Sequence, residues 1–126
     1  MPWACCRGVL HGGEALFVAD SGNHCIRAVS TEGAGGVGRT VFGTPQSPGK
    51  APTELNFPWS LCYHGTLLYV GDKYNMRIVV LSPDEPAAVR VVSDEWPWAS
   101  RFAPRGFASS PDGVVLLPTN SKARAG

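Results

Sequence analysis

The sequence predicts an all-β fold built from repeated units of short antiparallel strands. Glycine and proline together make up about a fifth of the 126 residues, which is usual for many short strands joined by tight turns. No stretch shows the apolar periodicity of an amphipathic helix. In addition, two stretches of the chain, which begin at Pro2 and Pro58, are similar to each other.

Both stretches open with Pro-Trp and carry an aliphatic–aromatic run that ends in aspartate. The runs are LFVAD, which ends at Asp20, and LLYVGD, which ends at Asp72. An asparagine follows each aspartate by three residues, at Asn23 and Asn75. Such self-similarity at a fixed spacing indicates a repeat architecture.

The repeats divide a single domain of residues 1–126 into three parts. Repeat 1 covers residues 2–43 and repeat 2 covers residues 58–93. A weaker third copy covers residues 104–126, with a turn signal, SSPDG, at 109–113 before a strand-like run, VVLL. No apolar run follows that strand, so we expect repeat 3 to be degenerate or truncated.

Each repeat also contains further strand-like segments outside the matched runs. VGRTVFG at 37–43 and AAVRVVS at 87–93 are rich in β-branched residues and are flanked by turn residues. Residues 44–58 form a proline-rich connection. A unit of four short strands, repeated at a spacing near 40–50 residues, is typical of a β-propeller blade. The sequence therefore predicts a partial propeller of about two and a half to three four-stranded antiparallel blades.

The repeated residues resemble the NHL-repeat family. LFVADSGNHCIRAV (16–29) matches its motif closely, and LLYVGDKYNMRIVVL (67–81) matches it with Tyr74 in place of glycine and Met76 in place of histidine. The resemblance implies four-stranded blades in a ring that about six blades usually close. It also implies that this chain, by itself, is an incomplete propeller.

In such a blade the polar residues after each run lie in a turn between two strands. We interpret five residues as turn-forming: Asp20, Gly22, Asn23, Asp72 and Asn75. Gly22 or Asn23 is expected to supply a positive φ, and the aspartates are expected to accept hydrogen bonds from turn amides.

Three histidines, His11, His24 and His64, are candidates for zinc ligands. The resembled family includes a zinc-dependent peptidyl-hydroxyglycine lyase, so a lyase-type enzyme is an alternative function. However, His11 and His64 both precede a glycine at similar places, and repeat 2 has methionine where repeat 1 has His24. We therefore favour turn roles, with no catalytic residue, no metal and no cofactor, and we expect His24 to be dispensable.

The segment DEWPWASRFAPRG (94–106) lies outside the repeated core and is rich in residue types that dominate interface hot spots. It supplies the candidate partner-binding residues Trp96, Trp98, Arg101, Phe102 and Arg105. The favoured function is therefore a non-catalytic protein–protein interaction module or scaffold. Single-stranded RNA binding, in which arginines and aromatics stack on bases, is the other alternative. The balance of 11 basic against 10 acidic residues disfavours it.

The four cysteines show no metal-binding spacing, and a disulfide between the adjacent Cys5 and Cys6 would be strained. Reduced thiols, together with the absence of a leader-like segment at the N-terminus, favour an intracellular location. No apolar run approaches the length of about 20 residues that a membrane helix needs. Since neither end of the repeat array looks polar, we expect the chain to associate with the remaining blades, with a protein partner or with a second copy, as a homodimer.

Overall fold

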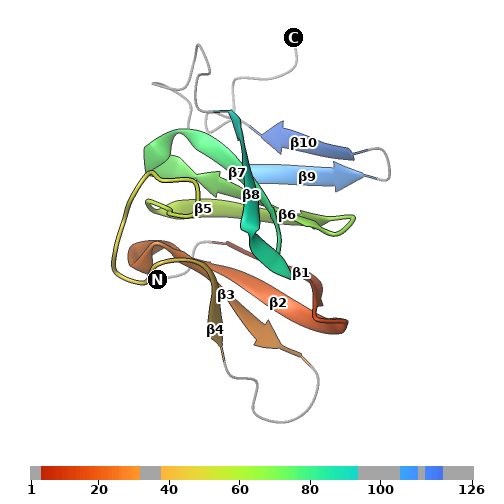
Figure 1. Cartoon of the computed structure of the whole chain (residues 1–126). Helices are drawn as coiled ribbons and strands as arrows, with labels where there is room; N and C mark the ends of the chain where they lie inside the picture. Colours follow the sequence, from red (N-terminus) through yellow and green to blue (C-terminus); the bar gives the residue numbers. More distant parts are fainter. Residues whose placement is uncertain (1–3, 32–37, 94–105, 111–112, 118–126) are drawn as a thin grey trace.

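The computed structural model describes residues 4–31, 38–93, 106–110 and 113–117. The regular elements of these residues are β-strands and two 3-10 turns, Ser21–Asn23 and Lys73–Asn75 (Figure 1). The first four strands are β1 (Ala4–Leu10), β2 (Gly13–Asp20), β3 (Cys25–Ser30) and β4 (Arg39–Gly43). The next four are β5 (Pro58–His64), β6 (Leu67–Asp72), β7 (Arg77–Ser82) and β8 (Glu85–Ser93). A final hairpin consists of β9 (Gly106–Ser110) and β10 (Gly113–Leu117). The prediction of an all-β chain is confirmed.

The strands form two four-stranded antiparallel sheets and the two-stranded hairpin. In sheet 1 (β1 to β4) and in sheet 2 (β5 to β8), each strand pairs with the next one along the chain. The first strands of the sheets, β1 and β5, lie next to each other, and β9 lies on the other side of β5 (Figure 1). Residues 44–57, which we call the connection, lead from β4 to β5 and contain no strand.

Tight two-residue loops join the first two strands of each sheet. His11 and Gly12 both have positive φ, at 52° and 81°, which is the pattern of a type I′ hairpin. In sheet 2 the loop begins one residue later, because His64 still pairs with Leu67 at the end of the ladder and Gly65 takes the positive φ of 66°. The two histidines are therefore not equivalent in the structure.

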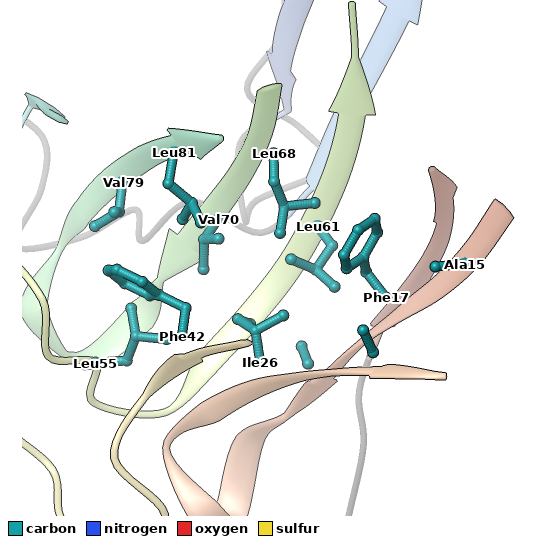
Figure 2. Close-up of a cluster of buried hydrophobic side chains, with 12 residues drawn as sticks. Ala15, Phe17, Ile26, Phe42, Leu55, Leu61, Leu68, Val70, Val79 and Leu81 are labelled. Carbon is teal, nitrogen blue, oxygen red and sulfur yellow. The ribbon is translucent and has the colours of Figure 1, made fainter. Parts of the chain in front are cut away.

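The main hydrophobic core lies between the two sheets (Figure 2). Strand β2 alternates strictly, with Ala15, Phe17 and Ala19 buried toward sheet 2, as expected for a strand with one buried face. Strand β7 is buried at every position from Arg77 to Leu81. Strand β7 therefore buries both of its faces, whereas β2 buries only one.

The first strands approach closely enough to require a glycine. The rings of Phe17 and Tyr63 stack with centroids 5.7 Å apart. A Cβ atom at Gly8 would lie 2.6 Å from an atom of each ring. A side chain at this position would therefore push β1 and β5 apart.

Candidate functional site

The turn at residues 72–76, which we call turn 2, contains a fully buried carboxylate. Asp72 ends β6, and its Oδ1 atom accepts a hydrogen bond from the backbone N–H of Asn56 at 2.7 Å. Its Oδ2 atom accepts hydrogen bonds from Asn75 Nδ2 at 2.8 Å and from Arg77 Nε at 2.9 Å. Burial raises the pKa of the Asp72 carboxyl, and these donors oppose that shift.

The Arg77 guanidinium holds the connection against turn 2. Its Nη1 atom donates to the carbonyl of Lys50 at 2.8 Å, and its Nη2 atom donates to the carbonyls of Ala51 and Glu54 at 2.9 and 2.7 Å. Asn75 Nδ2 also donates to the carbonyl of Gly49, at 2.8 Å. All three nitrogen atoms of the planar guanidinium donate hydrogen bonds, and such charged hydrogen bonds are strong and directional.

The turn at residues 20–24, which we call turn 1, repeats this arrangement in a more open form. Asp20 Oδ2 accepts hydrogen bonds from Asn23 Nδ2 at 3.0 Å and from Arg27 Nε at 2.8 Å. Burial alone would raise the pKa of the Asp20 carboxyl, but the hydrogen bonds from Asn23 and Arg27 outweigh it and hold the pKa below its ordinary value. The aspartate, asparagine and arginine therefore form one polar cluster in each sheet.

The backbone of the turns differs from the sequence interpretation. Neither Gly22 nor Asn23 has positive φ; instead His24 and Met76 do, at 60° and 54°, so that assignment was wrong. The reason is that Ser21–Asn23 forms a 3-10 turn, whose residues need negative φ. The residue that follows the 3-10 turn adopts the left-handed conformation. In turn 1 this residue is His24, whose N–H donates a hydrogen bond to the carbonyl of Ser21 at 3.1 Å.

The two aspartates also differ from that interpretation, because neither side chain caps its own 3-10 turn. The carboxylates bind the side chains of Asn23 and Asn75 in their own turns, and Asp72 takes its backbone donor from the connection. Asp72 therefore joins the connection to turn 2, whereas the hydrogen bonds of Asp20 with Asn23 and Arg27 link turn 1 to β3.

His24 joins turn 1 to the start of sheet 2. Its Nδ1 atom accepts a hydrogen bond from the backbone N–H of Phe57 at 2.9 Å. Beside it, the Ser21 hydroxyl donates to the carbonyl of Pro58, and Gln46 N–H donates to the carbonyl of Asn23 at 2.8 Å. The expectation that His24 is dispensable overlooked this contact, which methionine cannot make in the second repeat.

An aromatic–lysine cluster, made of Phe57, Trp59, Lys73 and Tyr74, lies beside turn 2. Lys73 Nζ lies 3.5 Å from the ring centroid of Trp59, which is a close cation–π contact. The rings of Phe57 and Tyr74 stack with centroids 4.9 Å apart, and Tyr74 is 59% exposed. The sequence analysis missed this cluster, although Lys-Tyr in place of the Ser-Gly of repeat 1 was a visible signal.

The candidate partner-binding residues from the sequence lie elsewhere in the chain. Trp96, Trp98, Arg101, Phe102 and Arg105 are outside the residues that the structure describes. Their role in binding stays a prediction.

The three histidines lie in separate places. The backbone N–H of His11 donates to Asp84 Oδ1 at 2.7 Å, in the loop between β1 and β2. His24 lies beyond the opposite end of β2, and His64 ends β5. Among the described residues, no three histidine, cysteine, aspartate or glutamate side chains are grouped to hold a metal ion.

All four cysteines are free thiols in the structure. Cys5 is exposed, whereas Cys25 and Cys62 are buried. Burial raises the pKa of the Cys6 thiol to about 12, with smaller contributions from Cys62 and Cys5. The Cys6 side chain is therefore in the thiol form at neutral pH, and the thiolate is the nucleophilic form.

Comparisons with protein-family models and with curated proteins find no match for this chain. The resemblance to NHL repeats therefore rests on the repeated residues themselves. The described part of the chain also contains no helix that is both long and apolar enough to span a membrane.

Proposed function

We propose that this chain is an incomplete NHL-type propeller that acts as a non-catalytic protein-interaction module or scaffold. The observation that supports this most is the equivalence of the two sheets. Each is a four-stranded meander with the same Asp–Asn–Arg cluster at the end of its second strand, and their first strands lie side by side. Each sheet then corresponds to one blade, and β9 with β10 to the start of a third.

The outer face of sheet 1 supports the idea that further blades belong beside it. Leu16, Val18 and Val29 are only half-buried there, and Val9 is 44% exposed. Repeat proteins bury such faces against the next unit. We favour further blades of a longer assembly as the cover, over a homodimer or an unrelated partner.

The size of the native particle tests this part of the proposal. Size-exclusion chromatography with light scattering should give a species larger than the chain's own mass of 13.4 kDa, or an aggregating one. A cooperatively melting monomer of that mass would contradict it, because its outer sheet face would then be stable in water.

The aromatic–lysine cluster is the proposed contact surface for a protein partner. Tyr and Trp are enriched in interface hot spots, and here Phe57 stacks on Tyr74 while Lys73 lies over the ring of Trp59. Single-stranded RNA is the second candidate, since an exposed ring such as that of Tyr74 beside a lysine also serves as a stacking platform. The net charge of +1 disfavours RNA.

A fluorescence titration with a labelled uridine oligonucleotide separates the two candidates. At physiological salt we expect no saturable binding. Saturable binding that weakens with salt, and that Tyr74→Ala lowers while Arg39→Ala does not, would instead assign the cluster to RNA.

A further inference from the structure

Two neighbouring pockets of the structure share Leu10, His11 and Arg39 as lining residues. The first pocket, of about 210 Å³, is also lined by Pro83 and Asp84 of the loop between β7 and β8, so it lies where the two sheets meet. The second pocket, of about 300 Å³, is lined by residues of sheet 1. Because one water molecule takes up about 30 Å³ in the liquid, each pocket has room for a small organic group.

Small side chains leave the space of the second pocket open. Ala15 and Ala28 line it from the core face of sheet 1, together with Leu10. Phe17, the next residue on the same face of β2, instead packs a ring against Tyr63, and Ala15 lies beyond it at the margin of the core (Figure 2). The second pocket therefore offers an apolar wall against which a short hydrocarbon chain can pack.

Arg39 supplies the positive charge at both pockets. It is an exposed residue at the start of β4. Within the ranges that the structure describes, its guanidinium takes part in no hydrogen bond and no ion pair. A guanidinium presents its donors in a planar fork that matches the two oxygens of a carboxylate. Arg39 is therefore available to bind a carboxylate ligand.

The acidic residues that line the pockets already have partners. Asp84 Oδ1 accepts a hydrogen bond from the backbone N–H of His11 at 2.7 Å and lies 3.4 Å from the Nδ1 atom of the same residue. Glu14 Oε2 lies 3.9 Å from Arg7 Nη1, and Glu14 Oε1 accepts a hydrogen bond from Thr31 Oγ1 at 3.1 Å. The negative charges of Asp84 and Glu14 disfavour a ligand with more than one negative charge.

We propose that the two pockets form a site for a small aliphatic monocarboxylate. The ligand carboxylate binds the Arg39 guanidinium, which both pockets share, and the hydrocarbon chain packs against Ala15 and Ala28 in the second pocket. The hydrogen bond between His11 and Asp84 ties the β1–β2 loop to the β7–β8 loop and holds the first pocket in shape without a ligand. A site formed in advance loses little conformational freedom when it binds.

Ligand-observed NMR with sodium hexanoate tests the site on the full chain, because the signals of a small ligand report binding whatever the size of the particle. We expect saturable binding that Arg39→Ala weakens at least tenfold. The matched control Arg90→Ala changes an exposed arginine of β8 that lines neither pocket, and it should leave binding unchanged. Hexanol, which lacks the charge, and inorganic phosphate, which lacks the chain, should each bind at least tenfold more weakly than hexanoate. Circular dichroism melts verify that both variants are folded.

Absence of saturable hexanoate binding, or equal binding by the Arg39→Ala variant, overturns the carboxylate site. Hexanol that binds as tightly as hexanoate would show an uncharged apolar site, and phosphate that binds as tightly would show a general anion site; either result contradicts the proposal. The outcome is separable from the particle size, since every lining residue belongs to sheets 1 and 2 or their loops. A stable monomer that binds hexanoate through Arg39 contradicts the incomplete propeller alone, and a larger assembly that does not bind it contradicts the carboxylate site alone.

Discussion

The polar clusters at turn 1 and turn 2 contain the same three kinds of side chain, but they differ in how far water reaches them. The side chains of Asp72 and Arg77 are 0% and 3% exposed, whereas those of Asp20 and Arg27 are 15% and 35% exposed. The Nε to Oδ2 distances are nearly equal, at 2.9 and 2.8 Å. The difference is the connection, which covers turn 2 and supplies carbonyls to Arg77.

The comparison indicates that the stability lost when an ion pair is broken depends on whether water can reach the pair. A buried pair that loses one partner leaves an uncompensated charge in a dry environment, which is costly. A pair that water reaches can replace the lost partner with solvent. The same motif should therefore be essential for stability in sheet 2 and of minor importance for stability in sheet 1 of the isolated chain.

The largest expected effect on stability comes from replacing the arginine of each cluster by alanine. Arg77→Ala should lower the free energy of unfolding by about 3–5 kcal/mol, because Asp72 and three connection carbonyls lose their partner. Arg27→Ala should cost less than about 1 kcal/mol. Chemical denaturation of both variants measures the difference. Equal losses would show that turn 1 is as well buried in solution as turn 2.

A smaller effect is expected where turn 1 meets the connection. His24→Ala removes the acceptor of the Phe57 N–H group, which should cost about 1–2 kcal/mol. His24→Asn is the matched control, since its side-chain oxygen can replace Nδ1 and asparagine tolerates the left-handed conformation. Thermal melts should rank wild type and His24→Asn together, above His24→Ala. A His24→Ala protein as stable as wild type would exclude a structural role for the His24–Phe57 bond.

The smallest effect concerns the pH dependence of turn 1. The pKa of Asp20 lies below its ordinary value in the folded chain, so its stabilisation is present above the unfolded pKa and is lost as the pH falls through the folded pKa. The difference in unfolding free energy between wild type and Asp20→Asn should therefore shrink from about pH 5 to about pH 3. Urea denaturation over that range measures it, and a constant difference would argue against an ionised Asp20 as the source.

The strands and the equivalence of the two turns could be predicted from the sequence, because both depend on local patterns. The alternation LFVA and the recurrence of Asp and Asn report strand faces and turn positions directly. Arg27 and Arg77 could not be matched, because counting from each aspartate aligns Arg27 with Val79 and Arg77 with Cys25. Their common role depends on the reach of a long side chain in three dimensions.

Two further features could not be predicted from the sequence, for related reasons. Glycine and asparagine are the usual residues at positive φ, but the 3-10 turn forces that conformation one residue later, on His24. The aromatic–lysine cluster joins residues 57 and 59 to residues 73 and 74, which meet only after β5 pairs with β6. The Lys-Tyr pair at 73 and 74 is visible in the sequence, but its contact with Phe57 and Trp59 is not.

The connection has a consequence for how the chain folds and unfolds. The N–H groups of Gln46 and Phe57 find their acceptors on turn 1, while that of Asn56 finds its acceptor on Asp72. Loss of either sheet therefore leaves donors of the shared segment without partners, and the loss weakens the sheet that remains. The two sheets should accordingly melt as one cooperative unit, in which coupling between neighbours, rather than the intrinsic stability of each sheet, determines whether the structure persists.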